Sequence, residues 1–146
     1  MKENGEYRFY TCAKEYYQID KYAFDTEALL VSGNGANVGY IHYYKGKFNA
    51  YQRTYVLDNF KSDIIFTKYF LDTKLSIRIL KEKKAGNTPY IVLDTLKEMI
   101  IKLPPLLEQQ KIAGFLTSVD NLIESKQQQI TQSQQWKKGL MQCLFV

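Results

Sequence analysis

A basic cluster in the middle of the chain is the first feature that could do chemistry. The cluster consists of Lys74, Arg78, Lys81, Lys83 and Lys84, and it is followed by the polar residues Asn87 and Thr88. Lys74, Arg78 and Lys81 have helical spacing, so in a helix their side chains would project from one face. A solvated charged face is the commonest explanation of this pattern. The sharper alternative is a stripe that tracks DNA phosphates, with the guanidinium of Arg78 bonded to a guanine edge.

Two asparagines lie in a glycine-rich turn, residues 32–37, that follows an apolar run. The turn lacks the Gly-Lys-Ser/Thr ending of a P-loop, and strand-like residues follow it where a P-loop continues into a helix. A structural turn is the plain interpretation. The functional one is that Asn34 and Asn37 reach DNA, because an Asn amide can make two hydrogen bonds to adenine. Arg53, expected in a strand, suits a structural ion pair as well as a DNA contact.

Catalytic patterns are weak throughout the sequence. Asp72 with Glu82-Lys-Lys84 superficially resembles the carboxylate and Glu-x-Lys of metal-dependent nucleases, but in a helix these side chains would not converge on a metal. Pro104-Pro105 stands between leucines and does not match the Asn/Asp-Pro-Pro-aromatic motif of adenine methyltransferases. We therefore expect no catalytic residue, and we rank a small DNA-acting enzyme as the weakest hypothesis.

Composition limits the remaining possibilities. His42 has no triad partner and is expected to face solvent or a partner, while Cys12 and Cys143 lack metal-ligand spacing and are expected to be free thiols. We thus expect neither a metal nor a cofactor. The net charge of +5 is only suggestive of nucleic acid. No apolar run approaches the ~20 residues of a membrane span, and the polar N-terminus has no signal-type segment, so a cytoplasmic location is expected.

The first part of the chain predicts a mixed α+β domain. Apolar and β-branched runs predict strands at residues 28–32, 38–44 and 47–57. Lys45-Gly46 suits a tight hairpin between the last two strands. The pattern then becomes helical, with Ser62 or Asp63 as the cap of a helix over residues 62–84. Asp94 is a plausible cap for one helical turn before a last strand at residues 99–103.

The end of the chain predicts one long helix, residues 104–146. Pro104-Pro105 suits its entry, where the first N–H groups have no intrahelical partner. The apolar residues then step by four and three, which defines a seam of Ile112, Leu116, Val119, Ile123, Ile130, Leu140 and Leu144. Lys126, Ser133 and Lys137 interrupt this seam. The domain is too small to cover it along its whole length, so we expect the helix to pair as a coiled coil with a second copy of the chain.

This helical region resembles the conserved helix of the specificity subunit of type I restriction–modification systems. The resemblance rests on Leu103-Pro-Pro-Leu-Leu-Glu-Gln-Gln-Lys-Ile112, on Val119-Asp120 and on Trp136-Lys-Lys-Gly-Leu-Met-Gln142. Upstream, Ala28-Leu-Leu-Val-Ser-Gly-Asn-Gly-Ala-Asn-Val-Gly39 and Phe48-Asn-Ala-Tyr-Gln-Arg-Thr-Tyr-Val-Leu57 are similar to segments of that family's DNA target-recognition domains. The resemblance covers nearly the whole chain.

The resemblance implies a half-length, non-catalytic specificity subunit. Full-length members carry two recognition domains and two such helices, whereas this chain has room for one of each. Residues 1–103 would be the recognition domain, N-terminally short, and residues 104–146 would serve dimerisation and subunit docking. The implied partners are double-stranded DNA with a bipartite target and a modification (methyltransferase) subunit. The implied DNA contacts are Asn34, Asn37, Arg53, Lys74, Arg78, Lys81, Lys84, Asn87 and Thr88. The alternative is a truncated interaction or decoy protein that binds the modification subunit without reading DNA.

Overall fold

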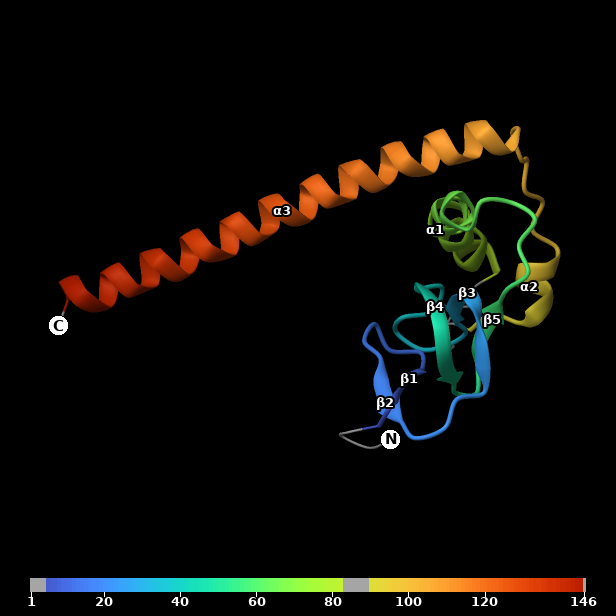
Figure 1. Cartoon of the computed structure of the whole chain (residues 1–146), viewed down its shortest axis with the longest axis horizontal. Coiled ribbons are helices and arrows are strands. Elements are labelled where there is room, and N and C mark those ends of the chain that lie inside the picture. Colours follow the sequence, from blue (N-terminus) through green and yellow to red (C-terminus); the bar gives the residue numbers. More distant parts are fainter. Residues whose placement is uncertain (1–4, 83–89, 146) are drawn as a thin grey trace.

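The computed structural model describes residues 5–82 and 90–145, and it contains a small sheet domain followed by a long helical arm (Figure 1). The five strands are β1 (Tyr7–Tyr10), β2 (Tyr17–Ile19), β3 (Phe24–Ser32), β4 (Ile41–Ala50) and β5 (Thr54–Leu57). The helices are α1 (Ile64–Glu82), α2 (Leu93–Lys97) and α3 (Leu106–Leu144). The mixed sheet and the long C-terminal helix confirm the predicted α+β fold class.

The strands form one sheet in the order β2-β1-β4-β3-β5. β1 pairs in parallel with β4, whereas the other pairs are antiparallel. The hairpin predicted at Lys45-Gly46 is wrong, because β4 runs through both residues while paired with β3. The turn lies earlier, at residues 33–40, where the Ser32 carbonyl accepts a 2.8 Å hydrogen bond from Gly39 N–H. Gly39 has a φ of 82°, a conformation that glycine adopts without steric cost.

The strand predicted over residues 47–57 is also interrupted, at residues 51–53. These residues form a turn between β4 and β5, in which the N–H of Thr54 donates to the carbonyl of Tyr51 at 3.1 Å. Arg53 has a φ of 66°, which is uncommon for a residue other than glycine. The prediction of Arg53 inside a strand is therefore wrong. The alternating sequence pattern does not reveal that this residue adopts the left-handed backbone conformation.

The two faces of the sheet carry separate cores. Because neighbouring strand residues point to opposite faces, Leu29 and Val31 pack toward α1 whereas Leu30 packs on the other face. The α1 side of the core also includes Ile41, Leu71, Leu75, Ile79 and Ile91. The other side is built around Tyr10, Ala28, Leu30 and Phe48. Only the first of these faces is covered by a helix of the described chain (Figure 1).

The predicted helix of residues 62–84 is present as α1, and the side chain of Asp63 caps it. The Asp63 carboxylate accepts a 2.8 Å hydrogen bond from the N–H of Phe66. The short helix α2 is also present, but Val92 is its N-cap and Asp94 lies in its first turn. Residues 99–103 are not in a strand, so that prediction is wrong. Met99 instead packs against the core, and the following residues lead to α3.

Helix α3 begins directly after the two prolines, with Pro105 as its N-cap. It has 39 residues, which at 1.5 Å per residue gives a length of about 58 Å. Its first turns pack across α1 and bury Gln109 and Ala113, whereas the rest projects away from the domain (Figure 1). The predicted long helix is confirmed, and most of its length has no intramolecular neighbour in the described chain.

Candidate nucleic-acid interface

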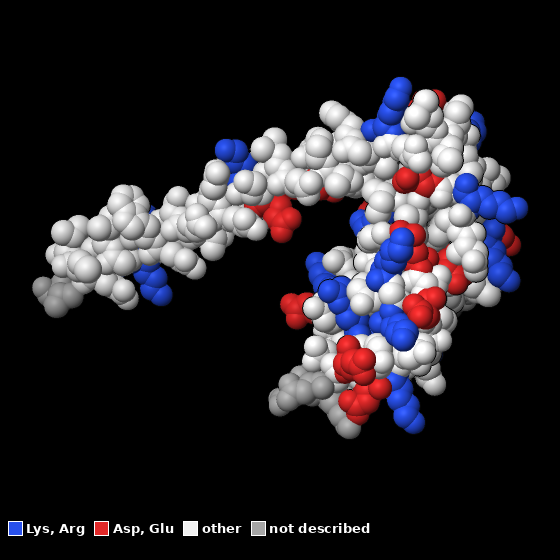
Figure 2. Space-filling model, in the orientation of Figure 1, with Lys and Arg blue, Asp and Glu red and all other residues white. Residues whose placement is uncertain are grey.

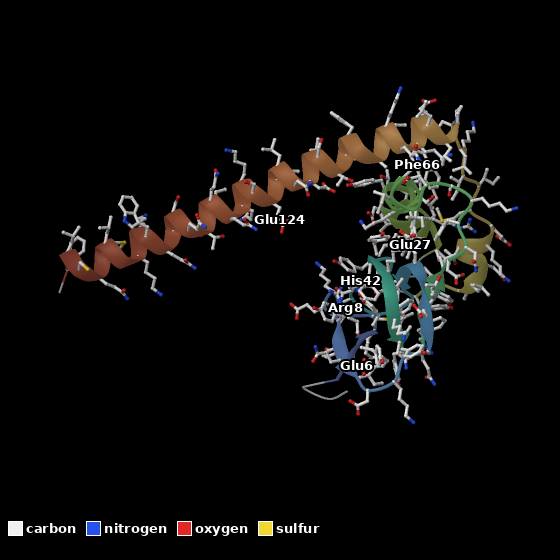
Figure 3. The ribbon with its side chains drawn as sticks, in the orientation of Figure 1. Glu6, Arg8, Glu27, His42, Phe66 and Glu124 are labelled. Carbon is white, nitrogen blue, oxygen red and sulfur yellow. The ribbon has the colours of Figure 1, made fainter. Side chains whose placement is uncertain are left out.

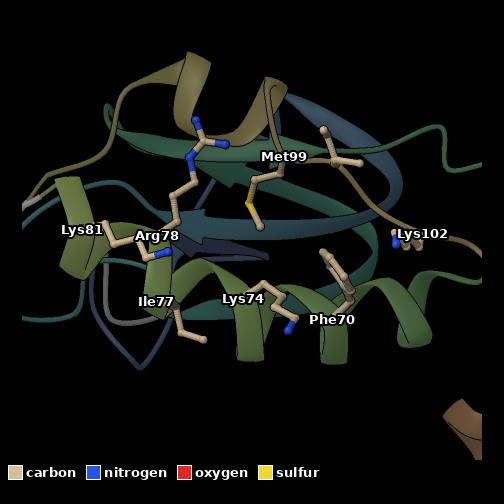
Figure 4. Close-up of a pocket in the computed structure, with 8 residues that line it drawn as sticks. Phe70, Lys74, Ile77, Arg78, Lys81, Met99 and Lys102 are labelled. Carbon is tan, nitrogen blue, oxygen red and sulfur yellow. The ribbon is translucent and has the colours of Figure 1, made fainter.

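A groove runs between α1 and the segment that leads to α3 (Figure 4). Its volume is about 810 Å³, and its lining consists of Phe70, Lys74, Ile77, Arg78, Lys81, Met99, Ile100 and Lys102. The three cations predicted to share one helical face, Lys74, Arg78 and Lys81, do lie together along this groove. The rest of the predicted basic loop, Lys84, Asn87 and Thr88, lies outside the described residues.

Charge and apolar surface are combined in this groove. None of the described residues that line it is acidic, and Lys102 adds a fourth cation from the opposite wall. The apolar part is unusually open, since Ile77 is 47% exposed and Ile100 is 87% exposed. Lys102 was missed by the sequence analysis because it is distant in sequence from the cluster on α1. The groove therefore offers positive charge to a phosphate and carbon surface to a sugar or an apolar side chain.

Among the described cations that line the groove, Arg78 forms an ion pair. Its Nη2 lies 3.2 Å from Oε2 of Glu98, which is located just after α2. The Glu98 side chain is 70% exposed, so this ion pair is weakly stabilising and can rearrange at little cost. Lys74 and Lys81 are exposed. The groove thus presents two exposed ammonium groups beside a guanidinium that forms a weak ion pair with Glu98.

The glycine-rich turn is a structural junction. The N–H of Gly33 donates to the carbonyl of Arg53 at 2.7 Å, and the Gly33 carbonyl accepts from the N–H of Ile91 at 2.8 Å. A methyl group on Gly33 would lie 2.3 Å from the Arg53 oxygen, so this close approach requires glycine. Next to the hydrogen bond from Ile91, Asn34 and Tyr90 form an isolated antiparallel β-bridge.

The predicted DNA contacts in and beside this turn have different surroundings. The Asn37 amide donates a 3.1 Å hydrogen bond to the carbonyl of Cys12, which ties the turn to the segment after β1. Asn34 is half-buried, and the Arg53 side chain is exposed. In the structure the Asn37 amide thus has a backbone partner, and the Arg53 side chain is accessible, while the DNA contacts of all three residues stay predictions. None of the three lines the groove on α1.

A second cationic feature, missed by the sequence analysis, lies on the helix-free face of the sheet. The guanidinium carbon of Arg8 lies 4.3 Å from the ring centre of Tyr16 and 4.6 Å from that of Tyr44. Its Nη1 donates to the hydroxyl of Tyr10 at 3.4 Å. The high tyrosine content of the chain was the available signal, but sequence alone does not bring Tyr16 and Tyr44 to opposite sides of one arginine.

His42 lies beside this feature in β4 and is half-buried, so it does not face solvent freely, while the expected contact with a partner stays a prediction. Its Nε2 lies 2.9 Å from the carbonyl oxygen of Ala13. Because a carbonyl oxygen can only accept, Nε2 carries the proton of the neutral ring and donates it in this hydrogen bond. Burial lowers the pKa of His42 below its usual value, although the bond to the Ala13 carbonyl acts in the opposite direction. The nearby Lys68 also lowers this pKa. His42 therefore attaches the segment after β1 to the sheet.

Within residues 5–82 and 90–145, no three His, Cys, Asp or Glu side chains are placed to hold a metal ion. Cys12 and Cys143 are both free thiols, as predicted. No described helix has the length and apolar character that a membrane span needs.

The seam of α3 remains largely accessible. The exposed fraction is 37% for Val119, 61% for Ile123 and 49% for Ile130. A neighbouring row is even more open: Phe115, Leu122 and Trp136 are spaced by multiples of seven residues and are 68%, 59% and 71% exposed. Few charges mark the distal half of this helix on the face seen in Figure 2. The two adjoining rows together widen the accessible apolar stripe of α3.

Comparison with known proteins assigns the fold to a family. The sequence model of the type I restriction modification DNA specificity domain matches residues 1–133. The type I restriction enzyme EcoDI specificity subunit of Escherichia coli is 37% identical over 143 residues, which are 97% of this chain and 31% of that subunit. A putative MjaX specificity subunit of Methanocaldococcus jannaschii is 37% identical over 112 residues, covering 77% of this chain and 24% of that protein.

A solved structure agrees with these matches. The S subunit of a type I restriction-modification system from M. genitalium superposes with a TM-score of 0.66 and 23% identity, over 85% of this chain and 34% of that chain. At this identity the likeness concerns the fold. The present chain spans about a third of the length of the relatives it matches.

Proposed function

This chain belongs to the type I restriction–modification DNA specificity family, and we propose that it is a non-catalytic DNA-reading unit for a methylation and restriction complex. The observation that carries the proposal is the family match over residues 1–133, which includes the sheet domain and most of α3. In this proposal separate modification and motor–nuclease subunits perform methylation and cleavage. The chain itself contributes the choice of target.

The groove on α1 is the proposed phosphate-binding surface. Lys74 and Lys81 on one wall and Lys102 on the other can each approach a backbone phosphate, while deoxyribose carbons contact the apolar floor. Arg78 is proposed as a base reader because its planar fork can bond guanine at two atoms. For that role its exposed bond to Glu98 must open or be shared with the base. Asn34 and Arg53 are proposed as further contacts beyond the groove.

Helix α3 is proposed to hold the assembly together. Its seam would pair with the seam of a second copy, arranged antiparallel, so that two sheet domains sit at opposite ends of the paired helices. The row of Phe115, Leu122 and Trp136 would then remain at the side of the pair. We propose this row as the contact for the modification subunit, because large exposed apolar residues need a protein partner.

The DNA proposal is tested by fluorescence anisotropy of a labelled random-sequence duplex titrated with the purified chain at several salt concentrations. We expect binding that weakens steeply with salt, and a log–log slope that flattens by about 1 for each of Lys74→Ala and Lys81→Ala. Lys138→Ala, which removes the same charge from the far end of α3, is the matched control and should leave the slope unchanged. Equal slopes in all variants would contradict the assignment of the groove.

A second candidate function is supported by the apolar floor of the groove. Ile77 and Ile100 expose more carbon surface than phosphate contact requires, and such a surface suits a protein partner. The chain would then be an interaction or decoy protein that occupies the modification subunit without reading DNA. In that case the purified chain would co-sediment with the modification subunit but would not change the anisotropy of any duplex.

A further inference from the structure

Among the described residues, no acidic side chain forms an ion pair with Arg8, in contrast to several other cations of the domain. Lys45, Lys68 and Arg78 pair with Glu27, Asp72 and Glu98, respectively. For Arg8, by contrast, the described residues supply two tyrosine rings and one hydroxyl. The pKa of Arg8 is raised chiefly by its bond to Tyr10, with smaller contributions from Tyr16 and Tyr44, and no carboxylate contributes. The site therefore keeps a full positive charge.

The surrounding rings fix the orientation of this charge. A guanidinium held between two aromatic faces has lost most of its rotamer freedom before any ligand arrives, so binding does not have to order it. One of its five N–H donors is used by the Tyr10 hydroxyl at 3.4 Å, a long bond. Tyr16, which forms the outer wall, is 46% exposed. The remaining donors can thus meet a ligand at the edge of the sandwich.

The neighbourhood extends the same chemistry. Lys14 places its ammonium 6.0 Å from the ring centre of Tyr40, and the Tyr40 ring is 39% exposed. Arg8 and His42 both lie on the side of the domain that faces the free length of α3 (Figure 3). This surface is formed by Arg8, Lys14, Tyr16, Tyr40 and Tyr44. Strand alternation places its two strand residues, Arg8 of β1 and Tyr44 of β4, on the face of the sheet opposite to α1.

We propose that Arg8 contacts double-stranded DNA from the helix-free face of the sheet, where its planar fork binds a pair of hydrogen-bond acceptors on the DNA. The inference rests on the proposed DNA-reading function and adds a second DNA-contacting surface to it. The acceptor pair is either the O6 and N7 edge of guanine or two oxygens of a backbone phosphate, since both match the planar fork of arginine. The tyrosines act as positioning residues that hold the fork.

The test is selection of bound duplexes from a randomised pool by the purified full chain, followed by sequencing and by anisotropy on the enriched motif. Arg8→Lys keeps the charge but removes the planar fork, whereas Arg8→Gln removes both. If Arg8 reads guanine, the preference for guanine over the other bases at one position of the motif should fall about 5- to 150-fold in both variants. The preferences at the other positions should stay unchanged. If it binds phosphate, Arg8→Gln weakens all sequences and flattens the salt slope by about 1, and Arg8→Lys restores most of the loss.

Two further variants separate DNA contact from a purely structural role. Lys47→Gln removes an equal charge from the opposite face of β4 and should leave both the motif and the slope unchanged. Tyr16→Leu removes one wall of the sandwich and should reproduce a weaker form of the Arg8→Lys effect in protein that melts as a folded domain. Folded Arg8 variants that retain the wild-type motif and affinity would overturn the inference while the DNA-reading function stands. A wild-type chain that enriches no motif would overturn both.

Discussion

The hydroxyl of Tyr69 on α1 donates a 2.6 Å hydrogen bond to Oδ2 of Asp120 on α3. The same hydroxyl lies 3.4 Å from Oγ1 of Thr117, one turn earlier on α3. These contacts fall where α3 begins to leave the domain, beyond the buried residues Gln109 and Ala113. The direction of the arm relative to the sheet is therefore set by a polar contact at its outer end as well as by packing at its start.

Tyr69→Phe should loosen the arm with little effect on the fold of the domain. The change removes the hydrogen bond to Asp120 but keeps the ring against α1. We expect a broader distance distribution between a dye on the domain and a dye at the exposed Cys143, measured by single-molecule energy transfer. Lys138→Ala is the control, since it lies on α3 far from the contact. An unchanged distribution in Tyr69→Phe would show that packing alone fixes the arm.

The same contact should depend on alkaline pH. Burial, followed by the bond to Asp120, raises the pKa of Tyr69 above its usual value of 10.0, because the neutral phenol is the donor. A raised pKa in the folded state means that this stabilisation is present below pH 10 and is lost as the pH rises through the raised value. At high pH the dye-to-dye distance distribution of the wild type should therefore approach that of Tyr69→Phe. The distribution of the variant should change less with pH, because it lacks the hydroxyl that titrates.

Gln109 should contribute more to stability than its neighbour Gln110. The Gln109 side chain is 4% exposed, accepts a 2.9 Å hydrogen bond from the N–H of Asp63 and donates a 2.7 Å bond to the carbonyl of Pro104. Gln109→Ala leaves these buried groups without partners, so we expect a loss of about 1–3 kcal/mol in the free energy of unfolding. Gln110 is exposed, so Gln110→Ala should change the free energy of unfolding by less than about 0.5 kcal/mol. Urea titrations of both variants and the wild type measure these differences.

His42 should make the domain less stable in mild acid. Burial lowers its pKa below the usual 6.5, so the unfolded chain binds a proton that the folded chain does not. The stabilisation is thus present above pH 6.5 and declines as the pH falls toward the lowered value. The measurement is the difference in unfolding free energy between pH 7.5 and pH 5.5 for wild type and His42→Gln. A His42 proton titration by NMR with a midpoint at or above 6.5 would contradict the account.

Self-association through α3 is predicted to depend on its seam. Val119→Asp and Ile123→Asp place charges on the proposed contact, and sedimentation should then detect a monomer where the wild type is a dimer. Glu124→Gln, at an exposed helix position, is the control and should leave the dimer intact. Lys126, Ser133 and Lys137 interrupt the seam, and we expect them to restrict the register. A wild-type chain that is already monomeric at high concentration would refute the pairing.

The helices were predictable from sequence because their signals are local. The step of four and three from Ile112 onward fixes α3, and its start after Pro105 follows from the missing proline N–H. The helical spacing of Lys74, Arg78 and Lys81 likewise placed them on one wall of the groove. Such patterns depend on neighbours within a few residues, so a single sequence is sufficient to read them.

The sheet was less predictable because its signals depend on distant residues. Lys45-Gly46 resembles a hairpin turn, yet the pairing of β4 with β3 holds both in a strand. The turn at Arg53 forms because its carbonyl accepts from the distant Gly33. The place of Lys102 in the groove and the contacts of Arg8 with Tyr16 and Tyr44 likewise depend on segments that are distant in sequence. Neither feature therefore belongs to a local motif. The parts of the candidate site that sequence could not supply are those built by contacts across the sheet.

The most direct test of the central claim is single-molecule sequencing of methylated bases in cells that contain the modification subunit, with and without this chain. The account predicts methylation that depends on the chain and falls on one motif. With a two-fold pair of chains, that motif should be an inverted repeat whose half-sites are separated by an unread spacer of roughly one DNA turn or more, as a helix pair of about 58 Å allows. Methylation that is the same without the chain, or at a single uninterrupted site, would contradict the account.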